Sequence, residues 1–210
     1  GGVAKTTSTL NLAAALAEKE MRVLCVDMDP QGNLTMSQGL NPDSIERSMF
    51  DVLVHRLPIE NVITNTEVDL AVSSIDLAGA ELALSSMIGR ERALEKALLP
   101  MKGTYDYVLV QLENTLAMIR ENLNPNVAIM GILPTMYDRR TLHAREAVEI
   151  LEENFGDLVF KTRIKKTIRY AEAPVKGTSV LKYDPTGKAA NAYRDLAKEV
   201  LNGAKAREHA

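Results

Sequence analysis

Two glycines, a lysine and two threonines stand directly in front of a predicted helix, and this order limits the possible folds more than any other feature of the chain. Residues 7–19 predict that helix, because leucine and alanine recur there at helical spacing among good helix formers. The free N–H groups and the dipole of a helix N-terminus attract anions. Small residues let the backbone close around a phosphate, a lysine reaches its outer oxygens, and a hydroxyl can bind Mg²⁺. The predicted phosphate loop consists of Gly1, Gly2, Val3, Ala4, Lys5, Thr6 and Thr7.

The strict phosphate-loop pattern is broken at two places. Its first glycine would lie upstream of Gly1, and Ala4 stands where a glycine usually precedes the lysine. The alternative interpretation is an ordinary helix start, with Thr6 or Thr7 as the N-cap residue. Because the chain begins at Gly1 without an initiator methionine, we also expect it to be a fragment.

A pair of aspartates follows the next predicted element. Residues 22–28 form a short apolar run, which predicts a buried parallel strand. Asp27 and Asp29 share one side of this strand by its period of two, at the carboxyl end where open α/β sheets bind their ligands. An acidic group at this place, facing a terminal phosphate, can orient water or hold Mg²⁺. The alternative is a polar turn that merely leaves the strand.

Strands and helices alternate along the rest of the chain. This order predicts an α/β fold with a mostly parallel sheet covered by helices on both faces, in a single domain over residues 1–210. Further strands are expected at residues 69–73, 105–110, 126–134 and 158–164. Further helices are expected at residues 48–55, 77–87, 91–99, 111–122, 142–154 and 187–201.

One junction in this scheme is physically odd. The strand expected to end at Val110 meets the helix expected to begin at Gln111, with no turn residue between them. Such connections usually need about 2–6 residues, because a buried strand cannot reverse at once into a surface helix. Either the strand ends early or a segment is missing at the 110/111 junction.

The charge pattern favours a local rather than a general contact with nucleic acid. The net charge is −3, yet residues 161–169 contain five basic side chains and no acidic one. Arg139 and Arg140 form a second small cluster. Phosphate contacts need such side chains on one surface and do not read base sequence. The alternative is an ordinary solvated surface. The five basic residues are Lys161, Arg163, Lys165, Lys166 and Arg169.

The remaining composition is that of a cytoplasmic protein. The only cysteine, Cys25, lies within an apolar run, so the chain cannot form an internal disulfide. No signal peptide, lipidation motif or bilayer-length apolar segment is found. We therefore expect a cytoplasmic protein without a membrane partner.

Six segments together resemble the Soj/ParA family of partitioning ATPases. They are GGVAKTTSTLNLAAALA, RVLCVDMDPQGN, YDYVL, TMYDRRT, IRYAEAP and YDPTGKAANAYRDLAKEV, in this order. The resemblance covers nearly the whole chain. It implies a P-loop fold that binds ATP and Mg²⁺, with Lys5 as the catalytic phosphate lysine, Thr6 on Mg²⁺ and Asp29 positioning the hydrolytic water. It also implies a homodimer that encloses two ATP molecules.

The resemblance further implies how the protein acts. The ATP-bound dimer would bind DNA non-specifically through Arg140 and Arg169, with Lys165 and Lys166 beside them, and would associate with the nucleoid. A ParB-type centromere-binding partner would trigger hydrolysis and release.

The chain departs from the family pattern in two respects, which leave alternatives open. A signature lysine expected just before the double glycine would lie upstream of Gly1, and an acidic switch segment expected after Val110 is absent from the sequence. One alternative is a nucleotide-binding remnant with impaired catalysis. Another is a MinD-like membrane-cycling ATPase, although the polar tail of residues 204–210 lacks the face of a membrane anchor.

Overall fold

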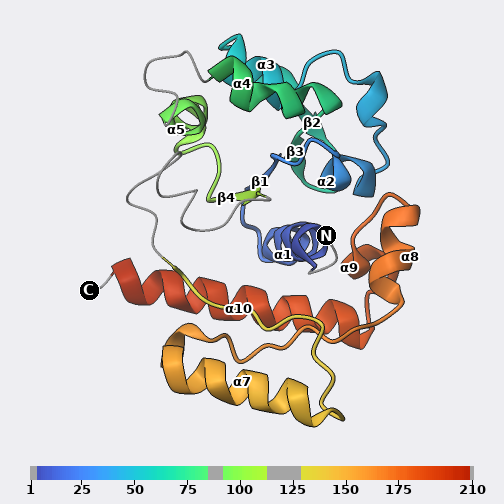
Figure 1. The fold of residues 1–210 in the computed structure, drawn as a ribbon, viewed down its shortest axis with the longest axis vertical. Coiled ribbons are helices and arrows are strands. Elements are labelled where there is room, and N and C mark those ends of the chain that lie inside the picture. The colour runs from blue at the N-terminus through green and yellow to red at the C-terminus, as the bar shows by residue number, and fades with distance from the viewer. Residues whose placement is uncertain (1–3, 85–91, 113–128, 209–210) are drawn as a thin grey trace.

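The computed structural model describes residues 4–84, 92–112 and 129–208, and its centre is a four-stranded sheet (Figure 1). The strands follow the order β2-β3-β1-β4 across the sheet. The central strand β1 pairs in parallel with β3 and with β4, whereas β2 pairs with β3 antiparallel. The prediction of a mostly parallel sheet is therefore confirmed. The strands are β1 (Val23–Asp27), β2 (Ile63–Asn65), β3 (Asp69–Ala71) and β4 (Tyr107–Gln111).

Helices lie on both sides of these strands (Figure 1). Helix α1 packs against β1 and β4, and α10 packs along the other side of α1. The longer helices agree with the predicted ones, since α1, α7 and α10 cover the segments expected to be helical. The helices are α1 (Lys5–Ala17), α2 (Asn33–Ser37), α3 (Met49–Val54), α4 (Ala80–Leu84), α5 (Ala93–Leu98), α7 (Leu142–Phe155), α8 (Arg169–Val175), α9 (Val180–Tyr183) and α10 (Lys188–Glu208). Short 3-10 turns occur at Pro42–Ser44, Ile59–Val62, Ile75–Gly79, Leu99–Met101 and Gly156–Leu158.

The core explains why β1 reads as an unbroken apolar run. All five residues of β1 are buried, because strands flank it on both edges and helices cover its faces. Tyr193 of α10 is fully buried, and its hydroxyl lies 3.2 Å from the Ser8 hydroxyl of α1. Asn11 is buried within α1 and links two segments, since its amide donates to the Thr7 carbonyl and accepts from the N–H of Val180. These contacts hold the first turn of α1 in place.

The prediction of strands at residues 126–134 and 158–164 is wrong for the described residues. Only isolated bridges form there, between Ile132 and Val159 and between Tyr137 and Lys165. The described part of the first segment passes across α10 on its way to α7, and the second leads from α7 back toward α8, so neither lies in the sheet (Figure 1). The two segments do pair with each other in parallel, for example through the hydrogen bond from the Phe160 N–H to the Ile132 carbonyl at 2.9 Å, but this pairing is interrupted. Among the described residues, neither segment joins the sheet, which ends at β4.

The helix expected to begin at Gln111 also needs correction. Gln111 is the last residue of β4 and pairs with Asp27 of β1, so the strand does not end early. Residues 113–122 of that predicted helix lie outside the described residues. Four short elements, α2, β2, α8 and α9, were not predicted, because a few residues carry too little periodicity to signal them. Among the described helices, none is both long and apolar enough to span a bilayer.

Candidate phosphate-binding site

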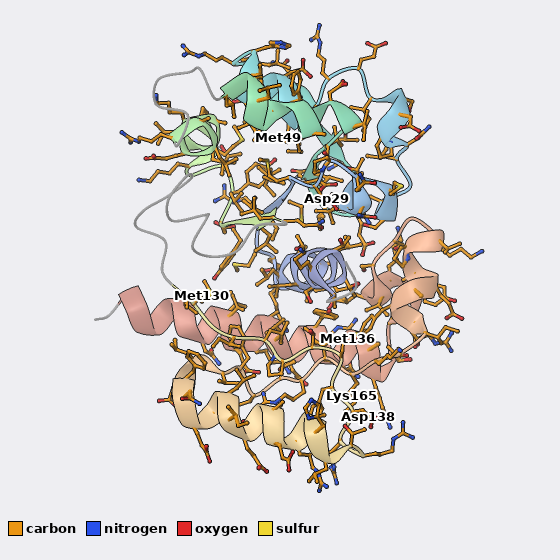
Figure 2. The ribbon with its side chains drawn as sticks, in the orientation of Figure 1. Asp29, Met49, Met130, Met136, Asp138 and Lys165 are labelled. Carbon is orange, nitrogen blue, oxygen red and sulfur yellow. The ribbon has the colours of Figure 1, made fainter. Side chains whose placement is uncertain are left out.

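A cleft of about 690 Å³ opens where the first turn of α1 meets the carboxyl ends of β1 and β4. One wall carries Lys5, Thr6 and Thr7 from α1, together with Asp29 and Gln111. The lining also includes Asn33 and Ser37 of α2, and Met136, Ile164, Lys165, Lys166, Thr167 and Tyr170. In Figure 2, Asp29 lies on one side of α1, with Met136 and Lys165 on the other. The cleft therefore brings together segments that are far apart in the sequence.

The start of α1 differs from an ordinary capped helix. The helix begins at Lys5, and its N-cap residue Ala4 has φ 65° and ψ 23°, without a capping hydrogen bond from its side chain. Thr6 and Thr7 lie inside the first turn, so the interpretation that either is the N-cap is wrong. The first N–H groups of a helix have no partner within the helix. With the exposed Lys5 beside them, they form a cationic mouth at one end of the cleft. Gly1, Gly2 and Val3 lie outside the described residues.

The Asp29 carboxylate is buried at the floor of the cleft, with 3% of the residue exposed. Its Oδ1 atom accepts a hydrogen bond from the Gln31 N–H at 2.9 Å. Its Oδ2 atom accepts from the Asn33 amide at 2.8 Å and from the Gln111 amide at 3.4 Å. The carboxylate is thus oriented by neighbours on three segments, while Asp29 still lines the cleft.

Asp27, the other aspartate of the pair, does not line the cleft. It is fully buried and accepts hydrogen bonds from both the backbone and the hydroxyl of Thr35, each at 2.8 Å. Burial raises the pKa of the Asp27 carboxyl above its ordinary value, although the hydrogen bonds from Thr35 oppose this shift. The two aspartates therefore have different surroundings, and only Asp29 reaches the cleft.

The basic residues predicted to bind DNA fall into two groups. Lys165 and Lys166 line the candidate phosphate cleft, and they also line a second cleft of about 810 Å³ together with Arg169. Arg169 forms ion pairs with Glu172 at 2.9 Å and with Asp184 at 3.6 Å. We call this second cleft, between residues 161–170 and α10, the basic cleft. Its basic residues are Lys161, Arg163, Lys165, Lys166, Arg169 and Lys188.

Arg140 lies outside both clefts. Its side chain is 90% exposed and pairs with Asp138 at 2.9 Å. Hydrogen bonds from Arg140 lower the pKa of Asp138 to about 2, so the pair remains charged at neutral pH. Asp138 lies beside Lys165 in Figure 2. The ion pair with Asp138 therefore brings Arg140 close to the segment that carries Lys165 and Lys166, at the rim of the basic cleft.

The sequence pattern missed Gln111 as a cleft residue. The pattern assigned this residue to a helix, whereas the structure places it at the end of β4, next to Asp29. Its neighbour across the sheet is Asp27, so strand pairing decides its position. The only signal available in the sequence was the uninterrupted apolar run ahead of it, which extends the strand to the cleft.

Comparison with known proteins decides the family. Residues 1–137 match the family model AAA_31, described as an AAA domain. The sporulation initiation inhibitor protein Soj of Bacillus subtilis is 36% identical to this chain, over 95% of the chain and 94% of Soj. The chain belongs to the Soj/ParA family. A second Soj/ParA relative, the chromosome-partitioning ATPase Soj of Thermus thermophilus, is 36% identical over 96% of this chain and 92% of its own length.

A solved structure with the same fold supports the P-loop assignment. It is a cobyrinic acid a,c-diamide synthase from Mycobacterium smegmatis with a bound ATP analog and magnesium. The two chains superpose with a TM-score of 0.80 at 31% identity, over 98% of this chain and 92% of the other.

The alignment with Bacillus Soj also reveals a length difference. It extends over 238 positions, whereas 95% of the 210 residues of this chain is about 200 residues. Roughly 40 aligned positions therefore hold no residue of this Soj/ParA chain.

Proposed function

We propose that this chain is an ATP-binding partitioning protein whose candidate phosphate cleft binds ATP with Mg²⁺. One observation carries the proposal: Lys5 and Thr6 of α1 line the same cleft as the buried carboxylate of Asp29. A helix mouth with a lysine suits the phosphates, and a hydroxyl suits Mg²⁺. The ATP analog and magnesium bound to the Mycobacterium smegmatis protein support the same ligand for this fold.

Each cleft residue would then have a separate task. Lys5 would neutralise the outer phosphate oxygens, and the Thr6 hydroxyl would be one ligand of Mg²⁺. The ion supplies charge stabilisation to the phosphoryl group as it is transferred. Asp29 would accept a hydrogen bond, and then a proton, from the attacking water. Among the described residues, only the Gln31 N–H donates to the Oδ1 atom of Asp29. This oxygen can therefore accept a further hydrogen bond from a water molecule.

We further propose that ATP controls binding to DNA. A homodimer formed around ATP would bind duplex DNA non-specifically through Arg169, Lys165 and Lys166, with Arg140 at the rim. The basic cleft supports this assignment, because Lys165 and Lys166 line it and the phosphate cleft alike. A ParB-type partner would stimulate hydrolysis and release the DNA.

A second candidate, a nucleotide-binding remnant without turnover, is favoured by the length difference. Roughly 40 positions of the Bacillus Soj alignment hold no residue of this chain, and β4 runs straight through the 110/111 junction. We propose that residues 1–210 are a single P-loop domain that lacks a segment at this junction. Comparing ATP turnover of this chain and of a variant with a family segment inserted after Val110 separates the two candidates. Turnover by the chain as it stands would exclude the remnant.

The binding proposal is tested with a fluorescent ATP analogue in the presence of Mg²⁺. Lys5→Ala should weaken binding by roughly 10- to 100-fold, because a charge-assisted phosphate contact is lost. Lys19→Ala is the matched control, since Lys19 is exposed near the other end of α1. Equal affinities of the Lys5→Ala and wild-type proteins would refute the assignment of the cleft.

The DNA proposal is tested by retention on duplex DNA with and without ATP at several salt concentrations. Arg169→Ala should reduce ATP-dependent retention and its salt dependence, whereas Arg47→Ala removes an exposed charge elsewhere and should not. Retention that is unchanged without nucleotide would contradict the ATP switch. ATP-dependent binding to anionic liposomes without DNA retention would instead indicate a MinD-like cycle.

A further inference from the structure

A closed ring of hydrogen bonds runs behind the cleft and passes through the backbone of Asp29. The Asp27 carboxylate accepts from the N–H of Asp29 at 3.1 Å and, with its other oxygen, from Thr35. The Thr35 hydroxyl in turn accepts from the N–H of Ser73 at 3.1 Å. The Ser73 hydroxyl donates to the carbonyl oxygen of Asp29 at 2.7 Å, which closes the ring. The ring joins the end of β1 to α2 and to the segment that follows β3.

The members of this ring are shielded from water. Asp27, Thr35 and Ser73 are fully buried, and Asp29 is 3% exposed. Asp27, Thr35 and Ser73 do not line the phosphate cleft. Because the ring holds both the N–H and the carbonyl of Asp29, it sets the orientation of that residue from both sides. The backbone orientation sets the direction of the Cα–Cβ bond of Asp29, and the hydrogen bonds from Gln31, Asn33 and Gln111 then hold its carboxylate.

Stability alone does not account for this arrangement. Burying two carboxylates two residues apart carries a desolvation cost and a mutual repulsion, and an apolar pair of similar size would avoid both. Burial raises the pKa of Asp27, which reflects the same cost. Residues that lower the stability of the fold are expected at sites where side chains must be held in one geometry. Among the described residues, the Asp27 carboxylate accepts hydrogen bonds from Asp29 and from Thr35 in the first turn of α2.

We propose that Thr35 and Ser73, acting through the ring with Asp27, are positioning residues that aim the Asp29 carboxylate at the water it activates. The inference rests on the role of Asp29 in the proposed function. The positioning role of Thr35 depends on its hydroxyl group, because this hydroxyl donates a hydrogen bond to Asp27 and accepts one from the N–H of Ser73. Replacing the hydroxyl by a methyl group breaks the ring at two bonds and leaves the shape of the side chain nearly unchanged.

The decisive comparison is Thr35→Val against Thr35→Ser in the full chain. Valine lacks the hydroxyl but keeps the branched shape, whereas serine keeps the hydroxyl. With ATP and Mg²⁺, Thr35→Val should lower kcat by about 100-fold, as a misplaced catalytic group does. The affinity for ATP, measured by binding, should stay within about twofold of the wild type, because Thr35 does not line the cleft. Thr35→Ser should restore turnover to within a few-fold of the wild type.

Hydrogen exchange gives a second readout that needs no turnover. The amides of residues 28, 29 and 31–33 should exchange about tenfold faster in Thr35→Val than in Thr35→Ser, while the amides of α10 should be unchanged. Ser73→Ala breaks the ring at the carbonyl of Asp29 and should loosen the same loop, which covers the case that Thr35→Val fails to fold.

The outcomes separate this inference from the proposed function. Failure of the wild-type protein to bind ATP would overturn the proposed function and, with it, the catalytic purpose of the ring. ATP binding with equal loop exchange in Thr35→Val and Thr35→Ser would overturn the positioning role alone. If the wild type binds ATP without turnover, the comparison of loop hydrogen exchange between Thr35→Val and Thr35→Ser decides whether the ring positions Asp29. A loss of turnover in Thr35→Ser as large as in Thr35→Val would also overturn the inference.

Discussion

Asn11 offers a sharp test of how the phosphate-binding end of α1 is held. It is 4% exposed in the middle of the helix, where a polar side chain is unusual. Its amide nitrogen donates to the Thr7 carbonyl at 2.7 Å, and its amide oxygen accepts from the N–H of Val180 at 2.7 Å. The side chain therefore ties the first turns of α1 to α9. Asn11→Ala removes both contacts at once.

The expected loss of stability follows from these contacts. The N–H of Val180, a fully buried residue, would lose its partner, which costs about 1–3 kcal/mol. The space left by the amide adds about 0.5–1 kcal/mol. Alanine has the better helix propensity, which returns roughly 0.5 kcal/mol. The free energy of unfolding should therefore fall by about 1–3 kcal/mol.

Equilibrium unfolding in urea measures this loss by linear extrapolation, with an unchanged m-value as the sign that the two states are the same. Asn202→Ala is the matched control, since Asn202 is exposed on α10 and its replacement should change the free energy by about 0.5 kcal/mol or less. A loss below about 0.5 kcal/mol for Asn11→Ala would refute the reasoning, because the N–H of Val180 would then have found another partner.

Three further predictions concern other contacts. Hydrogen bonds from Arg22 lower the pKa of Asp106 to about 2. The ionised carboxylate therefore stabilises the folded state above the ordinary pKa of about 3.9, and this stabilisation of the fold is lost as the pH falls toward 2. The gap in urea midpoint between the wild type and Asp106→Asn should accordingly shrink over that range, and a gap that stays constant would contradict it. Ala4→Gly should raise the free energy of unfolding, measured in urea titrations, by up to about 1 kcal/mol, because relief of the strain at the positive φ of Ala4 outweighs the added entropy of the unfolded chain. A lower free energy of unfolding would show that Ala4 is unstrained. Glu67→Gln should lower the thermal midpoint, at a cost of about 1–3 kcal/mol, because the amide cannot accept from both the N–H and the hydroxyl of Ser179 as the carboxylate does.

Local patterns in the sequence were sufficient for the elements that carry the site. The 3.6-residue period and the good helix formers predicted α1 and α10, and the apolar run from residue 22 predicted β1 with Asp29 at its carboxyl end. Such features depend on residues that are close together in the chain. The phosphate-loop pattern and the aspartate after the strand also predicted that Lys5 and Asp29 serve one site, and both residues line the same cleft; their roles there stay a prediction.

Only the tertiary structure decided which extended segments pair and which distant side chains meet. The run at residues 158–164 has the apolar pattern of a strand, yet among the described residues it bridges only to residues 132–137 and does not join the sheet. The position of Gln111 beside Asp29, and the ring through Thr35 and Ser73, depend on contacts between segments that are 38 to 82 residues apart. Periodicity reports how a segment is oriented toward water, whereas the choice of partner depends on packing of the whole chain.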